Sequence, residues 1–462
     1  MGVDSGIFIS LVFYLAYAGV ALIPYLVRRT SLKELDPLDP YFVLSILLFI
    51  YIISTLVDFE RTGLSDTLES VSSLSVVKFG LACLVGQLGL AVGELVGLRR
   101  AVRGGPRWTA GSHDIRLSLL IGPGLALAVI LLPFYADRLN IFDVSSYADT
   151  AFESRLDRML DRAAGVKDVF LREAPASLLL CACTALLLDR TRLLAFRLAA
   201  GAVLALYILT SVLSGSRGVL VATVTLPLMY YHYCVRRFSL VTMTTIGLAG
   251  VVLINALSIA RVSSNPEEMI AAVTEQVATQ GYGFLGVTGS GELKTSANLV
   301  RLIVGIDTGE DRYRWGEVLW SNIASTIPRP LWPERPPTGS ELFAEVFFPG
   351  SLQSGQGFGS FIFQDPYWDF SFVGVFIFSL ALAWSMRKFY IALVIRDGSP
   401  FWILVYAVIY SNLIISVVRG GIFAGIKGAM PPILPLLLIA AIVRFMPEER
   451  SKGRSHLSGT IR

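Results

Sequence analysis

Five arginines stand at positions where an arginine is costly to place or rigidly held. They lie in a glycine-bounded turn, in a proline-rich segment and at the ends of long apolar runs: Arg217, Arg329, Arg335, Arg261 and Arg419. A guanidinium group binds phosphate through two parallel hydrogen bonds and keeps its charge at any working pH. Converging on one cavity at the edge of a membrane, these side chains would suit a lipid diphosphate. For each one alone, snorkelling to the headgroups or a salt bridge that braces a loop is the open alternative.

Acidic and aromatic residues form a second candidate group. Asp365 and Asp369 flank Tyr367 and Trp368, and Glu345 lies earlier in the same polar region. A carboxylate beside a sugar hydroxyl can act as a general base, and aromatic rings pack on the apolar face of a pyranose ring. The alternative is a belt of aromatic side chains at the membrane interface with solvated acids, because an apolar run begins at the same place.

The composition places these residues in a membrane protein. The 462 residues are 54% hydrophobic and 16% charged, against roughly 25% charged in a typical soluble domain. Several apolar runs approach or exceed the length of about 18 residues that marks a candidate membrane-spanning helix. We therefore expect an all-α polytopic membrane protein. The cysteines fall in or beside apolar runs without metal-binding spacing, so they are interpreted as small core residues.

Hydropathy and length predict about eleven transmembrane helices. A long polar segment, 259–366, separates the eighth from the ninth. Near its middle, five prolines between Ile327 and Pro337 predict a stiff extended strut, because proline lacks the N–H that a helix or a central strand requires. Short helices are expected near 295–304 and from about 315 to 325. The predicted spans run roughly over 6–27, 41–58, 76–97, 117–136, 175–189, 193–213, 218–234, 238–258, 367–386, 401–418 and 429–445.

Clusters of arginine and lysine fall at every second boundary between the predicted spans, with Arg387 and Lys388 after the ninth. Because basic residues favour the cytoplasmic side, we expect the amino terminus outside and the carboxyl terminus inside. The expected organisation is eight spans in 1–258 with an outer loop at about 137–174, a large outer loop at 259–366, three spans in 367–445 and an inner tail at 446–462.

This topology limits the chemistry of the outer face. The three histidines all fall on the inner side, so no histidine is expected to act outside. Nothing in the sequence predicts a metal site or a nucleotide-binding P-loop, and no cofactor is expected. Glu94 and Lys78 lie within the third predicted span but near its ends. We expect them to snorkel to the interface rather than to relay protons.

The run Ser214-Gly215-Ser216-Arg217-Gly218, at the start of a predicted span, is similar to the Ser-Arg-Gly element of bacterial O-antigen polymerases, the Wzy-type oligosaccharide repeat-unit polymerases. The later features also follow that family's order: the strut, a Gly- and Phe-rich stretch, and then 367–374 leading into a span. The resemblance covers about 210–420. Asp369 and Ser371 stand where the family usually has asparagine and glycine. The related O-antigen ligases are expected to use an outer histidine, which the predicted topology does not provide.

The resemblance implies a GT-C-like helix bundle in the bacterial inner membrane, with a periplasmic amino terminus, a cytoplasmic carboxyl terminus and a large periplasmic cap. It implies a metal-independent glycosyltransferase of lipopolysaccharide and polysaccharide biosynthesis. The enzyme would transfer a glycan from undecaprenyl diphosphate to the non-reducing end of another lipid-linked unit. Donor and acceptor are then undecaprenyl-diphosphate-linked oligosaccharides. Membrane lipids and a chain-length regulator protein are the other expected partners, and nucleic acid is not.

Residue roles follow from the same resemblance. Arg217, Arg329 and Arg419 would stabilise the diphosphate as it leaves, because negative charge builds there in the transition state. Asp365 or Asp369 would take the proton of the acceptor. Substrate binding would fall to Arg261, Arg335, Glu345, Tyr367 and Trp368.

Two alternatives stay open at this point. One is a different lipid-linked glycan transferase of ligase type, which would make a single addition. The other is a transporter or flippase of lipid-linked glycans. A transporter should have internal repeats and charges along a midplane cavity, whereas this sequence concentrates its charge in the predicted outer cap.

Overall fold

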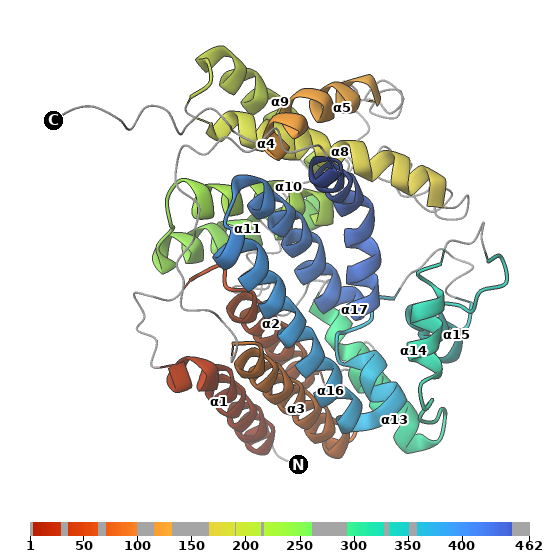
Figure 1. Cartoon of the computed structure of the whole chain (residues 1–462). Helices are drawn as coiled ribbons and strands as arrows, with labels where there is room; N and C mark the ends of the chain where they lie inside the picture. The colour runs from red at the N-terminus through yellow and green to blue at the C-terminus, as the bar shows by residue number, and fades with distance from the viewer. Residues whose placement is uncertain are drawn as a thin grey trace, which may run out of the picture.

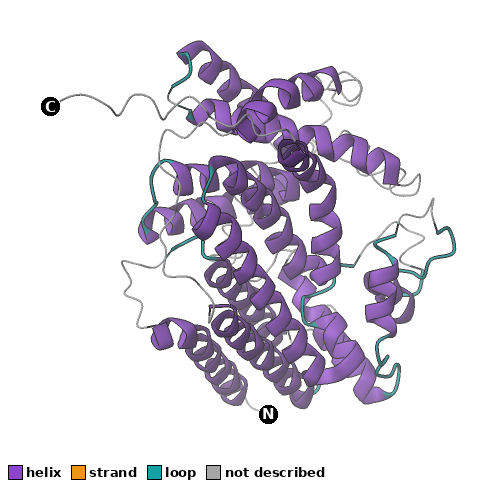
Figure 2. Ribbon diagram, in the orientation of Figure 1, coloured by secondary structure: helices purple, strands orange, loops and turns teal. Residues whose placement is uncertain are grey.

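The computed structural model describes residues 3–28, 36–62, 71–98, 115–131, 166–189, 191–213, 217–260, 293–327, 332–350 and 358–445. Within these ranges every regular element is helical (Figure 2). Most of the predicted loop at about 137–174, and the predicted tail 446–462, lie outside them. In chain order the elements are α1 (Val3–Arg28), α2 (Pro40–Thr62), α3 (Ser73–Leu98), α4 (Ile115–Leu119), the π-turn η1 (Leu120–Gly124), α5 (Leu125–Leu131), α8 (Val166–Leu188), α9 (Leu194–Leu213), α10 (Arg217–Cys234), α11 (Leu240–Ala260), the 3-10 turn η4 (Leu293–Ser296), α13 (Ala297–Thr308), α14 (Glu317–Ala324), α15 (Gly339–Phe347), α16 (Gln364–Tyr390), the π-helix η5 (Ile391–Asp397) and α17 (Pro400–Phe445).

In the described part of the chain, six helical stretches are long and apolar enough to cross a membrane. The described chain is therefore a helical membrane protein. Helices also lie at the other predicted spans, in α4–α5 and in α8 to α11, and their crossing of the bilayer stays a prediction. The six stretches are Ser10–Val27, Pro40–Val57, Ser73–Leu98, Gln364–Asp397, Pro400–Val418 and Gly420–Phe445.

Helices α3 and α16 make the most extensive packing between two elements of the described chain. Gly89, Gly93 and Gly97, which we call the glycine seam, recur every fourth residue on one face of α3. A Cβ at Gly89 would lie 2.5 Å from the carbonyl oxygen of Phe376, and a Cβ at Gly93 would collide with the carbonyl of Leu380. Glycine thus lets the two backbones approach closely, as small residues do between transmembrane helices.

Helix α17 is interrupted at Gly421, whose φ of 77° and ψ of 171° are not helical. The chain turns back on itself there (Figure 1). Each of the two arms is long enough to span, which agrees with two predicted spans joined at 419–421. The arms pack against α8 and α10.

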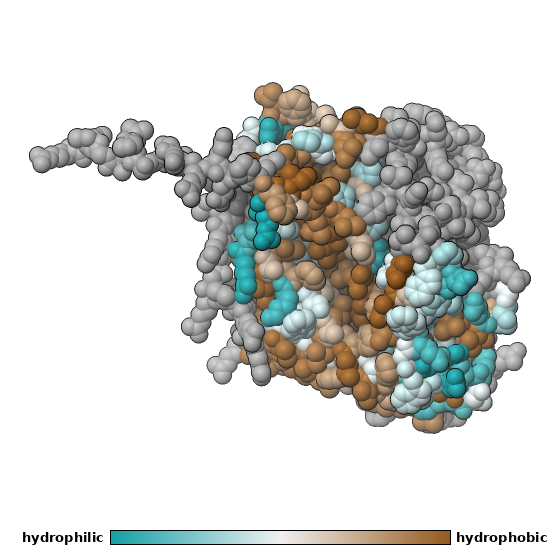
Figure 3. Space-filling view, turned by 45° about the vertical axis from the view of Figure 1, so that its right-hand side comes forward, coloured by the Kyte–Doolittle hydropathy of each residue, from teal (hydrophilic) through white to brown (hydrophobic). Residues whose placement is uncertain are grey.

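The described part of the large loop forms a cap, α13 to α15, at the end of the bundle where α1 begins (Figure 1). Lys78 Nζ lies 2.5 Å from Asp307 Oδ1, and Thr55 Oγ1 lies 2.5 Å from Ser296 Oγ. Lys78 therefore reaches an acidic partner in the cap rather than the lipid headgroups. Figure 3 shows hydrophilic side chains gathered over the cap and apolar side chains over the bundle.

Two short helices predicted inside the large loop are confirmed. Helix α13 lies at the segment expected near 295–304, and α14 lies within the segment expected from about 315 to 325. Helix α15 has no counterpart in the prediction. Its first turn is a capping box, in which Thr338 and Glu341 each bond the other's backbone N–H.

Candidate functional site

Helix α16 begins with a separate turn. Phe370 (φ −135°, ψ 21°) and Ser371 (φ 53°, ψ −144°) break the helical backbone. Residues 364–369 therefore form a half-helix ahead of the longer part of α16. Residues other than glycine seldom adopt a positive φ, and such strain persists only where the surroundings impose it. The break also leaves carbonyl groups at the end of the half-helix without their usual helical partners.

The half-helix and α14 cap each other through four hydrogen bonds, which we call the reciprocal cap. The N–H groups of Arg314 and Trp315 donate to the last two carbonyl oxygens of the half-helix at 2.9 and 3.2 Å. In return, the Asp369 carboxylate accepts from the N–H groups of Val318 and Leu319 at 3.1 and 2.7 Å. A carboxylate is favoured at a helix N-terminus as an acceptor and by the helix dipole. Asp369, which is 1% exposed, thus fastens the cap to the bundle.

Asp365 is the other acid of the half-helix, and its surroundings differ. Its side chain is partly exposed and lines a small hollow between the cap and the interrupted helices α16 and α17. Ser360 Oγ lies 2.5 Å from Asp365 Oδ1, and Asn322 Nδ2 donates to Oδ2 at 2.9 Å. Of the two predicted acids, Asp365 is the more exposed. The hollow is also lined by Leu319, Asn322, Ile362, Pro366, Asp369, Phe378, Gly421, Ile422 and Phe423.

Two glycines form walls against the Asp365 carboxylate. A Cβ at Gly339 would lie 3.1 Å from Asp365 Oδ2, and a Cβ at Gly421 would lie 3.2 Å from the same oxygen. Gly421 also requires its positive φ for the turn in α17. A larger residue at either position would push the carboxylate aside, so both glycines belong to the fit around it.

The predicted arginine set is only partly placed. Arg217 is the first residue of α10, and Arg419 precedes Gly421 by two residues, which brings its backbone to the edge of the hollow. Their side chains, and all of Arg261 and Arg329, lie outside what the structure describes. Convergence of these guanidinium groups stays a prediction.

Two further predicted binding residues lie in the cap. The Arg335 guanidinium donates to the carbonyl oxygen of Ser325 and, at 2.9 Å, to that of Ile327. It braces the chain at the end of α14. Glu345 is exposed on α15 and is not among the residues that line the hollow described here.

The structure corrects the roles expected for Tyr367 and Trp368. Their exposed fractions are 2% and 0%, so neither ring has a face open to a sugar, and neither belongs to an interfacial belt. Trp368 Nε1 donates to Asp311 Oδ2 at 2.9 Å, and the Arg314 guanidinium lies 5.4 Å from the centre of the Trp368 ring. Both aromatics pack the junction between cap and bundle instead.

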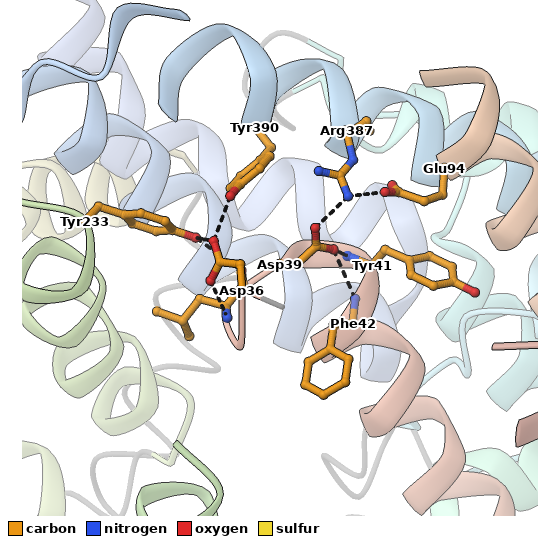
Figure 4. A network of polar contacts seen from close by, with 9 residues as sticks. Asp36, Asp39, Tyr41, Phe42, Glu94, Tyr233, Arg387 and Tyr390 are labelled. Atoms are coloured by element: carbon orange, nitrogen blue, oxygen red, sulfur yellow. Dashed lines mark hydrogen bonds and ion pairs between the residues drawn. The ribbon is translucent and has the colours of Figure 1, made fainter. Parts of the chain in front are cut away.

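A second polar network lies at the other end of α3 (Figure 4). Arg387 Nη2 lies 2.6 Å from Asp39 Oδ2 and also bonds Glu94. Glu94 is 1% exposed and Arg387 is 2% exposed. This corrects two expectations, because Glu94 does not snorkel and Arg387 is not a free basic residue at a span boundary. The charges are buried because each has an opposite partner.

Asp36 lies beside this network (Figure 4). The hydroxyls of Tyr233 and Tyr390 donate to Asp36 Oδ2 at 3.0 and 2.7 Å, and His232 Nε2 lies 3.1 Å from Oδ1. The N–H of Phe238 donates to His232 Nδ1 at 3.0 Å, so Nδ1 carries no hydrogen and Nε2 does. Burial alone would raise the pKa of Asp36, but the hydrogen bonds from His232 and Tyr390 outweigh it and lower that pKa below its usual value.

Comparisons with protein-family models, with curated proteins and with solved structures found no match to this chain. Function is therefore inferred from the described residues. Among them Asp365 is a partly exposed carboxylate, held by two hydrogen bonds and flanked by two glycines, at the cap end of an apolar helix bundle.

Proposed function

We propose that this protein is a glycosyltransferase of the bacterial inner membrane that polymerises lipid-linked oligosaccharide repeat units on the periplasmic face. A glycan would pass from undecaprenyl diphosphate to the non-reducing end of another lipid-linked unit. The observation that carries the proposal is the placement of Asp365 in the hollow beneath the cap. The sequence resemblance to Wzy-type polymerases supplies the substrate class.

The proposed step needs a base and a stabilised leaving group, and no metal ion. The acceptor hydroxyl oxygen forms a bond to the anomeric carbon of the donor while the bond from that carbon to the diphosphate oxygen breaks. Asp365 takes the hydroxyl proton. The leaving diphosphate gains negative charge, which guanidinium groups stabilise. Arg419 is the first candidate for that role, because its backbone lies at the edge of the hollow, and Arg217 and Arg329 are proposed beside it.

The differing surroundings of the two acids assign their roles within this proposal. Asp369 is buried and has both carboxylate oxygens engaged by backbone N–H groups of α14. Asp365 is partly exposed and its partners are side chains. We therefore assign proton transfer to Asp365 and an anchoring role to Asp369.

A reconstitution tests the proposal directly. Purified protein in nanodiscs receives undecaprenyl-diphosphate-linked repeat units and a chelator, without nucleotide, and the products are separated on a gel. We expect a ladder of increasing size from the native protein and none from Asp365→Asn. Asp189→Asn is the matched control, because Asp189 lies after α8 and bonds Thr191 there. A single step up in size would point instead to a ligase-type transferase.

A transporter of lipid-linked glycans is the second candidate, and one observation favours it. Both α16 and α17 are interrupted, at Ser371 and Gly421, and Gly421 lies beside Asp365 of the α16 half-helix. Discontinuous helices line the substrate sites of many transporters. A flipping assay with the same vesicles separates the two functions, since a transporter moves the lipid-linked unit without forming a glycosidic bond.

A further inference from the structure

We infer that Asn322 is the positioning residue of Asp365 and that it leaves Oδ1 as the oxygen that takes up the proton. The inference rests on the proposed function for its chemistry, and its geometry rests on two hydrogen bonds of the Asn322 amide. Asn322 Oδ1 accepts from the N–H of Gly339 at 2.9 Å, and Asn322 Nδ2 donates to Asp365 Oδ2 at 2.9 Å. One amide thus joins the start of α15 to the acid in the hollow.

The backbone contact settles which way the amide points. A backbone N–H only donates, so the atom of Asn322 facing Gly339 must be the oxygen. The NH2 group then faces Asp365, and because it only donates, Asp365 Oδ2 must present a lone pair to it. A hydrogen on Oδ2 in that direction would meet the N–H of Asn322 head-on. A proton bound by Asp365 is therefore placed on Oδ1.

The space around the carboxylate leads to the same assignment. A Cβ added at Gly339 or Gly421 would lie 3.1 or 3.2 Å from Oδ2, so a side chain at either position would crowd this oxygen. Oδ1 instead faces the hydroxyl of Ser360 at 2.5 Å. A hydroxyl can donate to Oδ1 while Asp365 is charged and rotate to accept once Oδ1 is protonated. Ser360 thus suits both protonation states, whereas Asn322 suits only an unprotonated Oδ2.

The side chains that donate to Asp365 are neutral, so a charge introduced at position 322 tests the contact between Asn322 and Asp365. From α14 it faces the neutral Asn322, from the preceding segment it faces the neutral Ser360, and on the half-helix Asp369 lies one turn further on. Asp369 is tied to backbone N–H groups of α14. A carboxylate introduced at 322 would stand in direct contact with Asp365, and a like charge at that distance favours the protonated acid.

In the proposed reaction one O–H bond and one bond to the diphosphate break, and one glycosidic bond forms. The acceptor O–H bond breaks, its proton goes to Asp365 Oδ1, and its electron pair forms the bond to the anomeric carbon. The electron pair of the broken bond to the donor leaves with the diphosphate. Asn322 touches neither sugar in this scheme; it holds Oδ2 and leaves Oδ1, beside the Ser360 hydroxyl, to take up the proton.

Labelling with dicyclohexylcarbodiimide tests the inference without relying on activity, because this reagent modifies protonated carboxyl groups. The full-length protein in detergent is labelled over a series of pH values, and mass spectrometry follows the peptide that contains Asp365. Asn322→Asp is expected to move the midpoint of Asp365 labelling upward by about one pH unit or more. Ser360→Ala should also move it upward, since it removes a donor to the charged form.

Asn298→Asp is the matched control. It adds the same charge to the same cap, but Asn298 donates to the carbonyl of Gly359 at 2.7 Å and not to Asp365. In Asn298→Asp the midpoint pH of Asp365 labelling is expected to stay at the native value. An unchanged midpoint in both Asn322→Asp and Ser360→Ala, or an equal shift in Asn298→Asp, would overturn the inference.

The gel assay separates this inference from the proposed function. If native protein makes the ladder, the pH profile of kcat/KM should shift with Asn322→Asp as the labelling does. If the labelling shifts but native protein makes no ladder, the positioning role stands and the polymerase proposal fails. If the native protein makes the ladder but the midpoint of Asp365 labelling does not shift in Asn322→Asp and Ser360→Ala, the positioning role is wrong and the polymerase proposal stands.

Discussion

At the scale of single residues, hydrogen-bond partners decide what each buried acid does. Both oxygens of Asp369 accept from backbone N–H groups of α14, whereas the partners of Asp365 are the side chains of Asn322 and Ser360. Asp36 accepts from two tyrosine hydroxyls beside His232. For Asp36 these hydrogen bonds outweigh burial, so its carboxylate is stable as an anion although it is largely removed from water.

Asp36 makes stability depend on pH. Its pKa is lowered in the folded protein, so its contribution is fully present above the unfolded value of about 3.9 and is lost as pH falls through the lower folded value. We expect Asp36→Asn to lower the Tm in detergent at pH 7 by about 2–4 °C for each kcal/mol lost. Thermal melts of both proteins should then converge as pH falls below about 4. A gap in Tm that stays constant down to pH 3 would contradict this.

Residue types alone identified Asp365 and Asp369 as a pair but not their division of roles. The partners of Asp369 are 50 and 51 residues away in the chain, and no local spacing reveals them. Arg387 shows the same limit. It has the sequence context of a basic flank after a span, and only its pairing with Asp39 and Glu94, 348 and 293 residues distant, explains its burial.

At the scale of helices, local signals predicted elements and their ends, but not the neighbours of each helix. Short helices were expected near 295–304 and from about 315 to 325, and α13 and α14 lie there. The capping box Thr338 to Glu341 was equally readable and marks the start of α15. The glycine seam is visible in the sequence too, yet its partner α16 becomes clear only when the backbones are seen together.

The glycine seam predicts a sharp contrast between two identical substitutions. In Gly93→Ala the new methyl group would collide with the carbonyl of Leu380, while in Gly247→Ala nothing lies within 4 Å. We expect Gly93→Ala to destabilise the protein by about 1–3 kcal/mol. Gly247→Ala should be neutral or stabilising by up to about 1 kcal/mol, because alanine favours a helix. Thermal melts in the same detergent compare them, and equal behaviour would refute tight α3–α16 packing.

The reciprocal cap predicts local loosening on removal of one carboxylate. Asp369→Asn replaces an acceptor pair by one oxygen and one NH2 group, which would face the N–H groups of α14. Hydrogen exchange of the peptides covering 314–324 should quicken by about tenfold or more, for a loss of roughly 1.4 kcal/mol. Peptides from α8 should keep their native rates and serve as the internal control. Unchanged exchange in 314–324 would mean that Asp369 does not hold the cap.

At the scale of the whole molecule, composition was enough to predict a helical membrane protein, since the apolar runs are longer than a soluble fold uses. The count of spans is harder. Helices α4, α5 and α8 to α11 lie where spans were predicted, and their crossing of the bilayer stays a prediction. Orientation depends on basic flanks, and the burial of Arg387 removes one member of that pattern.

Cysteine labelling tests the predicted orientation. Glu334 is exposed in the cap, and Arg192 is exposed between α8 and α9. Glu334→Cys should react with a membrane-impermeant maleimide on intact spheroplasts, and Arg192→Cys only after permeabilisation. The native cysteines are buried or half-buried, and the unsubstituted protein measures their background. The reverse pattern would invert the topology and move Asp365 to the cytoplasmic side.

The glycine seam also bears on how the chain is made. Glu94, beside the seam, and its partner Arg387 are 293 residues apart, and a ribosome adds about 5–20 residues per second. About 15–60 s of synthesis therefore separate the two sides of the contact. Throughout that interval the small-residue face of α3 and the carboxylate of Glu94 have no α16 to cover them. Chains that stop before α16 keep both uncovered, which makes them expected substrates of membrane proteolysis.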